Sequence, residues 1–111
     1  MTTTVQKQVL INARALIADP ARWTQRMYAC TATGQKVSWY DQSAKKWCAM
    51  GALYRAAYDL LGDPKEAMRI ANATAKSIRP RRRFRGGLPA LNDTRGHAAV
   101  LAAFDVALRV A

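Results

Sequence analysis

The sequence lacks the features of a membrane or secreted protein. No apolar run approaches the ~18 residues that a membrane helix needs. The longest run is about seven residues, Ala98 to Phe104. The first residues, Met1-Thr2-Thr3-Thr4, have neither the basic nor the apolar region of a secretory signal. These absences predict a cytoplasmic protein without a membrane partner.

Cysteine and histidine are also scarce. The two cysteines, Cys30 and Cys48, cannot form a disulfide framework, and we expect reduced thiols in a cytosolic chain. The single histidine, His97, and the two cysteines do not have the short spacing of zinc ligands. Gly86-Gly87 lacks the frame of a phosphate-binding loop. We therefore predict no metal and no cofactor.

Acidic residues are few as well. Seven Asp and Glu face 18 Lys and Arg, which gives a net charge of +11 and a pI near 10.5. Such a balance favours polyanions or acidic protein surfaces as partners. Half of the 111 residues are apolar, which is enough to form the core of one domain, residues 1–111.

The most apolar stretch of the chain is residues 47–61. Its apolar positions recur at three and four, which predicts a helix that is buried on most sides. Arg55 and Asp59 interrupt the pattern four residues apart and can pair. Asp41 or Ser43 is the expected N-cap, and Gly62 ends the helix. Gly51 allows neighbouring helices to approach closely.

Three more helices are predicted around this stretch. The first covers about residues 4–18 and begins at the capping box of Thr3 and Gln6. The next follows Asp63-Pro64 and ends before Pro80. The last begins near Asn92, which we expect to act as a helix cap, and continues to the C-terminus, with Asp105 and Arg109 as a surface pair.

Residues 26–40 change to the period of a β-hairpin. Thr33-Gly34 forms the expected turn, which would place Cys30 opposite Val37 and Tyr28 opposite Trp39. The predicted architecture is mainly α: a compact bundle of about four helices, with one small β-hairpin at about 26–40 packed on it and a basic loop at about 79–90.

Several short motifs resemble an uncharacterised domain family of bacteria and their phages. They are Leu16-Ile17, Trp23-Thr24-Gln25, Trp47-Cys48-Ala49-Met50-Gly51-Ala52-Leu53, Asn92-Asp93, Val100-Leu101 and Phe104-Asp105. The resemblance covers most of the chain except the basic loop. It implies a shared fold and a phage or mobile-element setting, but no catalytic residues.

The basic loop is the clearest functional signal. It contains Arg79, Arg81, Arg82, Arg83 and Arg85, with Phe84 among them. Guanidinium groups suit phosphate oxygens, and an aromatic ring can stack on an unpaired base. We therefore predict a small basic non-enzymatic protein that binds DNA or RNA through this loop, aided by Lys45 and Lys46. The alternatives are an acidic protein partner, as for a phage-encoded modulator of a host complex, and a solvated loop without a partner.

Two further hypotheses concern other side chains. Cys48 with His97, Asn92 and Asp93 could form a cysteine-based triad, but Cys48 lies in an apolar helix, so we predict no enzyme. We expect most of the aromatic residues to be core, with Tyr40 as the best candidate for an exposed ring; the alternative is a ligand pocket or partner face. They are Trp23, Trp39, Trp47, Tyr28, Tyr40, Tyr54 and Tyr58. The wide apolar face of the C-terminal helix makes a homodimer a further alternative.

Overall fold

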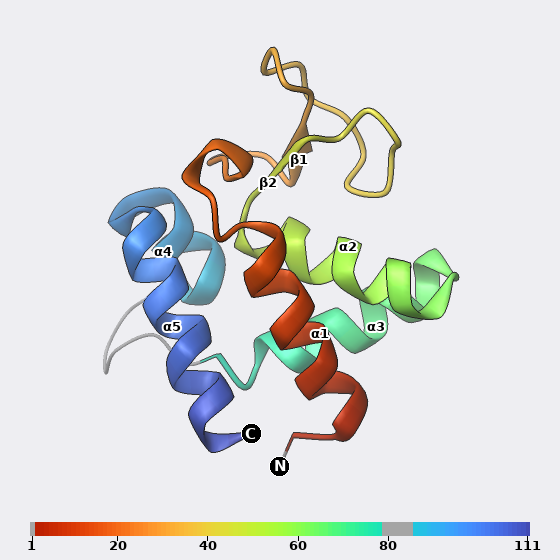
Figure 1. Ribbon diagram of the computed structural model, residues 1–111, viewed down its shortest axis with the longest axis vertical. Coiled ribbons are helices and arrows are strands. Elements are labelled where there is room, and N and C mark those ends of the chain that lie inside the picture. Colours follow the sequence, from red (N-terminus) through yellow and green to blue (C-terminus); the bar gives the residue numbers. More distant parts are fainter. Residues whose placement is uncertain (1, 79–85) are drawn as a thin grey trace.

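The computed structural model describes residues 2–78 and 86–111 (Figure 1). Within these ranges there are five α-helices, with a short 3-10 helix and a two-stranded antiparallel sheet between the first two of them. The elements are α1 (Thr4–Leu16), η1 (Pro20–Arg22), β1 (Ala29–Cys30), β2 (Lys46–Trp47), α2 (Ala49–Leu61), α3 (Pro64–Ala75), α4 (Gly87–Arg95) and α5 (His97–Val110). The sheet and its loops stand at one end of the molecule, and both termini lie at the other (Figure 1).

Local sequence signals set the starts of three elements, and those of α1 and α3 are as predicted. Thr3 and Gln6 form the capping box of α1, in which each side chain accepts a hydrogen bond from the other residue's backbone N–H. Asp19 caps η1 through the N–H of Ala21. Asp63 caps α3 through the N–H of Glu66, with Pro64 as the first helical residue.

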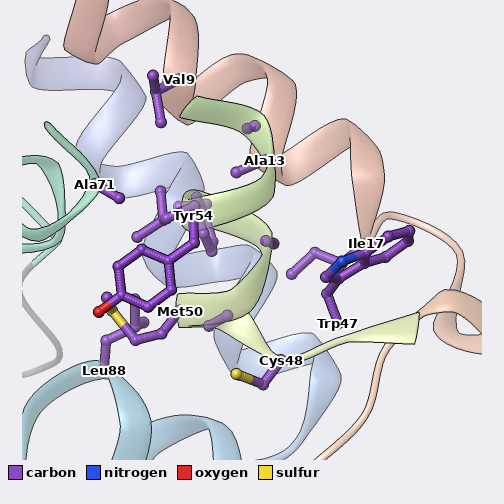
Figure 2. Packing of buried hydrophobic residues seen from close by; sticks show 14 of the residues in the cluster. Val9, Ala13, Ile17, Trp47, Cys48, Met50, Tyr54, Ala71 and Leu88 are labelled. Carbon is purple, nitrogen blue, oxygen red and sulfur yellow. The ribbon is translucent and has the colours of Figure 1, made fainter. Parts of the chain in front are cut away.

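The predicted central helix is confirmed as α2, which packs against both α1 and α3. Its residues Ala49, Ala52, Leu53 and Ala57 are fully buried. Figure 2 shows α2 residues Met50 and Tyr54 near Leu88 on one side, whereas Trp47 lies near Ile17 on another. The expected Arg55–Asp59 pair is present at 3.1 Å, and Gly62 follows the helix in the left-handed conformation.

The N-cap of α2 was predicted wrongly. The helix begins one residue after Cys48, whose Sγ accepts a hydrogen bond from the N–H of Gly51 at 3.2 Å. Asp41 instead accepts from Ser43 within the preceding loop. The expectation failed because a cysteine in an apolar run carries no obvious capping signal, while Asp41 and Ser43 do.

The hairpin prediction is wrong in its pairing. The second strand is Lys46–Trp47, so that Ala29 pairs with Trp47 and Cys30 with Lys46. Within residues 26–40 only an isolated bridge forms, and it places Lys36, not Val37, opposite Cys30. Tyr28 therefore does not face Trp39 across a ladder. Gly34 does adopt the positive φ expected of a turn, but long-range pairing with the chain before α2 outweighs the local hairpin.

The C-terminal prediction is wrong in three respects. There are two helices instead of one: α4 begins at Gly87, inside the segment expected to be loop, and the chain breaks at Gly96 before α5. Asn92 lies within α4 and does not cap it. Asp105 pairs with Arg14 of α1 at 2.5 Å instead of with Arg109, so this carboxylate links the first helix to the last.

Among the described residues, none of the helices is both long and apolar enough to span a membrane.

Candidate nucleic-acid interface beside the small sheet

Asn92 of α4 joins three segments that are distant in the sequence. It is only 1% exposed. Its Oδ1 accepts hydrogen bonds from the Trp23 indole Nε1 at 2.7 Å and from the backbone N–H of Ala49 at 2.9 Å. Its Nδ2 donates to the carbonyl oxygen of Thr24 at 3.1 Å. One buried amide thus ties α4 to the N-terminus of α2 and to the chain after η1.

Asp93 and Gln25 extend the same junction outward. The Gln25 side chain donates to the carbonyl oxygens of Asn92 and Asp93. The Asp93 carboxylate accepts from the backbone N–H of Arg26 at 2.9 Å. Arg26 itself has φ +64°, a conformation that non-glycine residues seldom adopt. These contacts fix where the chain turns from η1 toward the sheet.

Gly51 sets the distance between α2 and the residues that lead into β1. A Cβ atom at this position would lie 1.9 Å from the carbonyl oxygen of Tyr28. The same oxygen accepts a hydrogen bond from the backbone N–H of Cys48 at 3.2 Å. The close approach that we predicted at Gly51 is therefore made by the bend that precedes β1 and not by a helix.

Two hollows share Tyr28 and Lys36 among the residues that line them. The smaller, about 220 Å³, is also bordered by Arg26, Cys48 and Asp93. The larger, about 460 Å³, is lined by Tyr28, Lys36, Val37, Ser38 and Trp39. Together they form a surface on which two cations lie beside an aromatic ring.

The cysteine constellation is only partly brought together. Cys48, Asn92 and Asp93 all border the smaller hollow. His97 does not line it: its ring nitrogen Nε2 lies 2.6 Å from the carbonyl oxygen of Ile17, and its ring packs against Trp23. Burial raises the pKa of the Cys48 thiol, which lowers the thiolate fraction that a nucleophile requires.

Metal-binding groups are dispersed in this part of the chain. Across residues 2–78 and 86–111, no three His, Cys, Asp or Glu side chains cluster in a way that could hold a metal ion. Both cysteines are free thiols and both are buried.

The predicted basic site divides between the described residues and the segment outside them. Arg79, Arg81, Arg82, Arg83, Phe84 and Arg85 all lie outside the described residues. Lys45 is exposed and lies directly before β2, whereas Lys46 is half-buried and lies in β2. The arginine segment continues through Gly86 into α4, where Pro89 borders the smaller hollow. Pro89 follows the last arginine of that segment by four residues.

Sequence reasoning missed Arg26, Tyr28 and Lys36 as site residues. The predicted hairpin pairing placed Tyr28 inside and against Trp39, yet the residue is 51% exposed. The expectation for Tyr40 is confirmed, since it is 45% exposed. Trp39, Trp47 and Tyr54 are core, as expected. Arg26 and Tyr28 are separated by the apolar Met27, but no regular alternation of polar and apolar residues links them to Lys36.

The motifs behind the family resemblance meet at this place. Trp23, Cys48 and Asn92 come from three separate motifs and lie within one junction. The molecule is thus defined as a small, mainly helical, strongly basic domain with a hydrogen-bonded junction beside a minimal sheet.

The chain belongs to a family of unknown function (DUF6197), whose model matches residues 1–110. Comparisons with curated proteins and with solved structures gave no significant match.

Proposed function

We propose that this protein is a small, basic, non-enzymatic binding protein that contacts nucleic-acid phosphates through the arginine-rich segment and through Lys45 and Lys46. The observation that carries the proposal is the distribution of charge. Five arginines fall within residues 79–85, and the chain between Pro20 and Trp47 holds five more cations but only one carboxylate, Asp41. The cations are Arg22, Arg26, Lys36, Lys45 and Lys46.

Three of the protein's seven carboxylates form ion pairs with arginines of the helices. Among the described residues the ion pairs are Arg14–Asp105, Arg55–Asp59 and Arg69–Glu66, all between helical residues. Lys45 and Lys46 form no ion pair with a carboxylate in that part of the chain. Cations left without internal partners are available to phosphates, which give affinity without sequence preference.

The test is a binding titration with labelled single strands and duplexes at two salt concentrations. One variant replaces Arg81, Arg82, Arg83 and Arg85 with alanine. A matched variant removes four exposed cations elsewhere, Lys7, Lys65, Arg69 and Arg109. If the segment binds phosphates, only the first variant loses most of the affinity, and its dependence on salt falls by about 0.9 in log–log slope for each lost duplex contact.

The opposite result is equally specific. No binding by the native protein at low salt, or equal losses in both variants, would overturn the proposal. Retention of a single protein from a lysate treated with nuclease, with no binding to nucleic acid, would assign the cations to an acidic protein partner instead.

A further inference from the structure

The surface around Tyr28 has a fixed geometry. We define the Tyr28 face as Tyr28, Lys36, Val37, Ser38 and Trp39, the residues that line the larger hollow. The hydrogen bond from the Cys48 N–H holds the Tyr28 backbone against α2. This close approach is possible because Gly51 has no side chain. The Tyr28 ring contacts Tyr54 edge-on, with the ring centroids 5.5 Å apart. About half of the side chain nevertheless faces solvent.

The aromatic rings near this face form a connected cluster. Trp39 lies 5.4 Å from Tyr54 and 4.8 Å from Tyr40, between ring centroids. Trp39 and Tyr54 are buried, whereas Tyr28 and Tyr40 are the exposed members. All four tyrosines of the protein belong to this cluster, since Tyr58 contacts Trp39 and Tyr40. The buried rings therefore support two exposed ones from beneath.

The charged residues that line the two hollows indicate which hollow suits a phosphate. Lys36 lines both hollows, and Arg26 borders the smaller one. The carboxylate of Asp93 also borders the smaller hollow, so it would repel a phosphate there. The larger hollow has Lys36 and no carboxylate among its lining residues. A phosphate is thus favoured beside Lys36, within reach of the Tyr28 ring.

We propose that the Tyr28 face binds single-stranded nucleic acid, with a base stacked on Tyr28 and the adjoining phosphate at Lys36. The inference rests on the proposed function and specifies its ligand. Aromatic rings stack on any unpaired base, because every base has a π-face, but the bases of a duplex are already stacked on each other. An exposed, supported ring beside a cation is the arrangement that single-strand binding requires.

The experiment measures the affinities of a fluorescent 15-nucleotide thymidine strand and of a duplex of the same length at low salt. The variants are Tyr28→Ala, Tyr28→Trp and Lys36→Ala. Leu60→Ala serves as the control, since Leu60 is an exposed apolar residue at the far end of α2. Circular dichroism confirms the fold of each variant, and Lys36→Ala supplies an independent test if Tyr28→Ala does not fold.

We expect the native protein to prefer the single strand. Tyr28→Ala should weaken the binding of the single strand by roughly tenfold, whereas Tyr28→Trp, which keeps an aromatic ring, should retain it. Lys36→Ala should weaken single-strand binding more at low salt than at high salt. Leu60→Ala should leave single-strand binding unchanged.

The contrary outcomes separate this inference from the function it rests on. Equal affinity for both ligands, with Tyr28→Ala behaving like Leu60→Ala while the quadruple arginine variant still loses binding, overturns the Tyr28 face and leaves the proposed function standing. No binding of either ligand overturns both. Binding of a polyglutamate peptide in place of the strand, lost in the same variants, overturns it in favour of an acidic protein.

Discussion

At the scale of single residues, Asn92 determines how the sheet end is joined to the helices. Its amide makes two hydrogen bonds as an acceptor, and as a donor it reaches both Thr24 and Asp93. Replacing a buried amide with this many partners is strongly destabilising, because each partner loses its hydrogen bond and cannot form another with water. The sequence suggested a helix cap here, and the side chain does satisfy a helix N-terminus, but that of α2.

Replacing Asn92 with alanine should destabilise the protein severely. Loss of the amide leaves the N–H group of Ala49 unsatisfied in a buried site and that of Trp23 in a partly buried one, at an expected cost of about 2–4 kcal/mol. Urea denaturation measures the free energy of unfolding. The control is Asn12→Ala on α1, whose side chain bonds only the exposed Gln8 and which we expect to cost under about 0.5 kcal/mol. Equal effects of the two substitutions would contradict the role of Asn92.

Gly51→Ala tests the close approach of Tyr28 through the sign of its effect. In an unobstructed helix the change would stabilise the protein by about 1 kcal/mol. Here the new Cβ would meet the Tyr28 carbonyl oxygen, so the backbone must move. We expect a net destabilisation of about 1–3 kcal/mol, measured by thermal or urea unfolding. A more stable variant would show that α2 and the Tyr28 segment are further apart.

At the scale of the elements, the sequence predicted those that depend on neighbours in the chain. The capping box at Thr3, the Asp63-Pro64 start of α3 and the apolar period of α2 are all local signals, and all are confirmed. The pairing of Ala29 with Trp47 depends on residues that are far apart, and a two-residue strand carries no periodic pattern. This strand pairing could therefore not be predicted from local sequence signals.

The break between α4 and α5 illustrates a signal that was present but ambiguous. Gly96 has φ +92° and ψ 178°, a conformation nearly confined to glycine. A lone glycine in a helical pattern is compatible with either a break or a continuous helix. We expect Gly96→Ala to cost about 1–3 kcal/mol in urea unfolding. An unchanged or higher stability would support the single helix that the sequence suggested.

The contact between α1 and α5 should depend on pH. The hydrogen bond from Arg14, together with its charge, holds the pKa of Asp105 below its ordinary value. Ionised Asp105 therefore stabilises the fold at pH values above the ordinary carboxyl pKa of 3.8, and this contribution is lost as the pH falls through the lowered pKa. Both side chains are partly exposed, so the expected contribution is at most about 1 kcal/mol.

A double-mutant cycle measures this pair. Arg14→Ala, Asp105→Asn and the double variant are unfolded in urea at pH 7 and at pH 2.5. The coupling energy should be favourable at pH 7 and smaller at pH 2.5, because the carboxyl becomes protonated as the pH falls through its lowered pKa. A coupling that is independent of pH would show that the contact is not electrostatic.

At the scale of the whole molecule, exposed aromatic rings and cations occur together at one end. The sheet end carries the exposed tyrosines and cations between Pro20 and Trp47, while both chain termini lie at the opposite end (Figure 1). Charge and composition predicted a polyanion partner, but they could not place Tyr28 and Lys36 together. That juxtaposition depends on the contacts of Gly51 and Asn92, which come from distant parts of the chain.

Nucleic-acid binding at this end of the molecule is tested directly by one measurement. Isotope-labelled protein is titrated with a short thymidine strand, and backbone amide chemical shifts are followed by NMR. We predict the largest changes at Tyr28, Lys36 and Lys46 and in residues 79–85, with little change on α3. Changes confined to α1 and α3, or none at saturating strand, would contradict the claim.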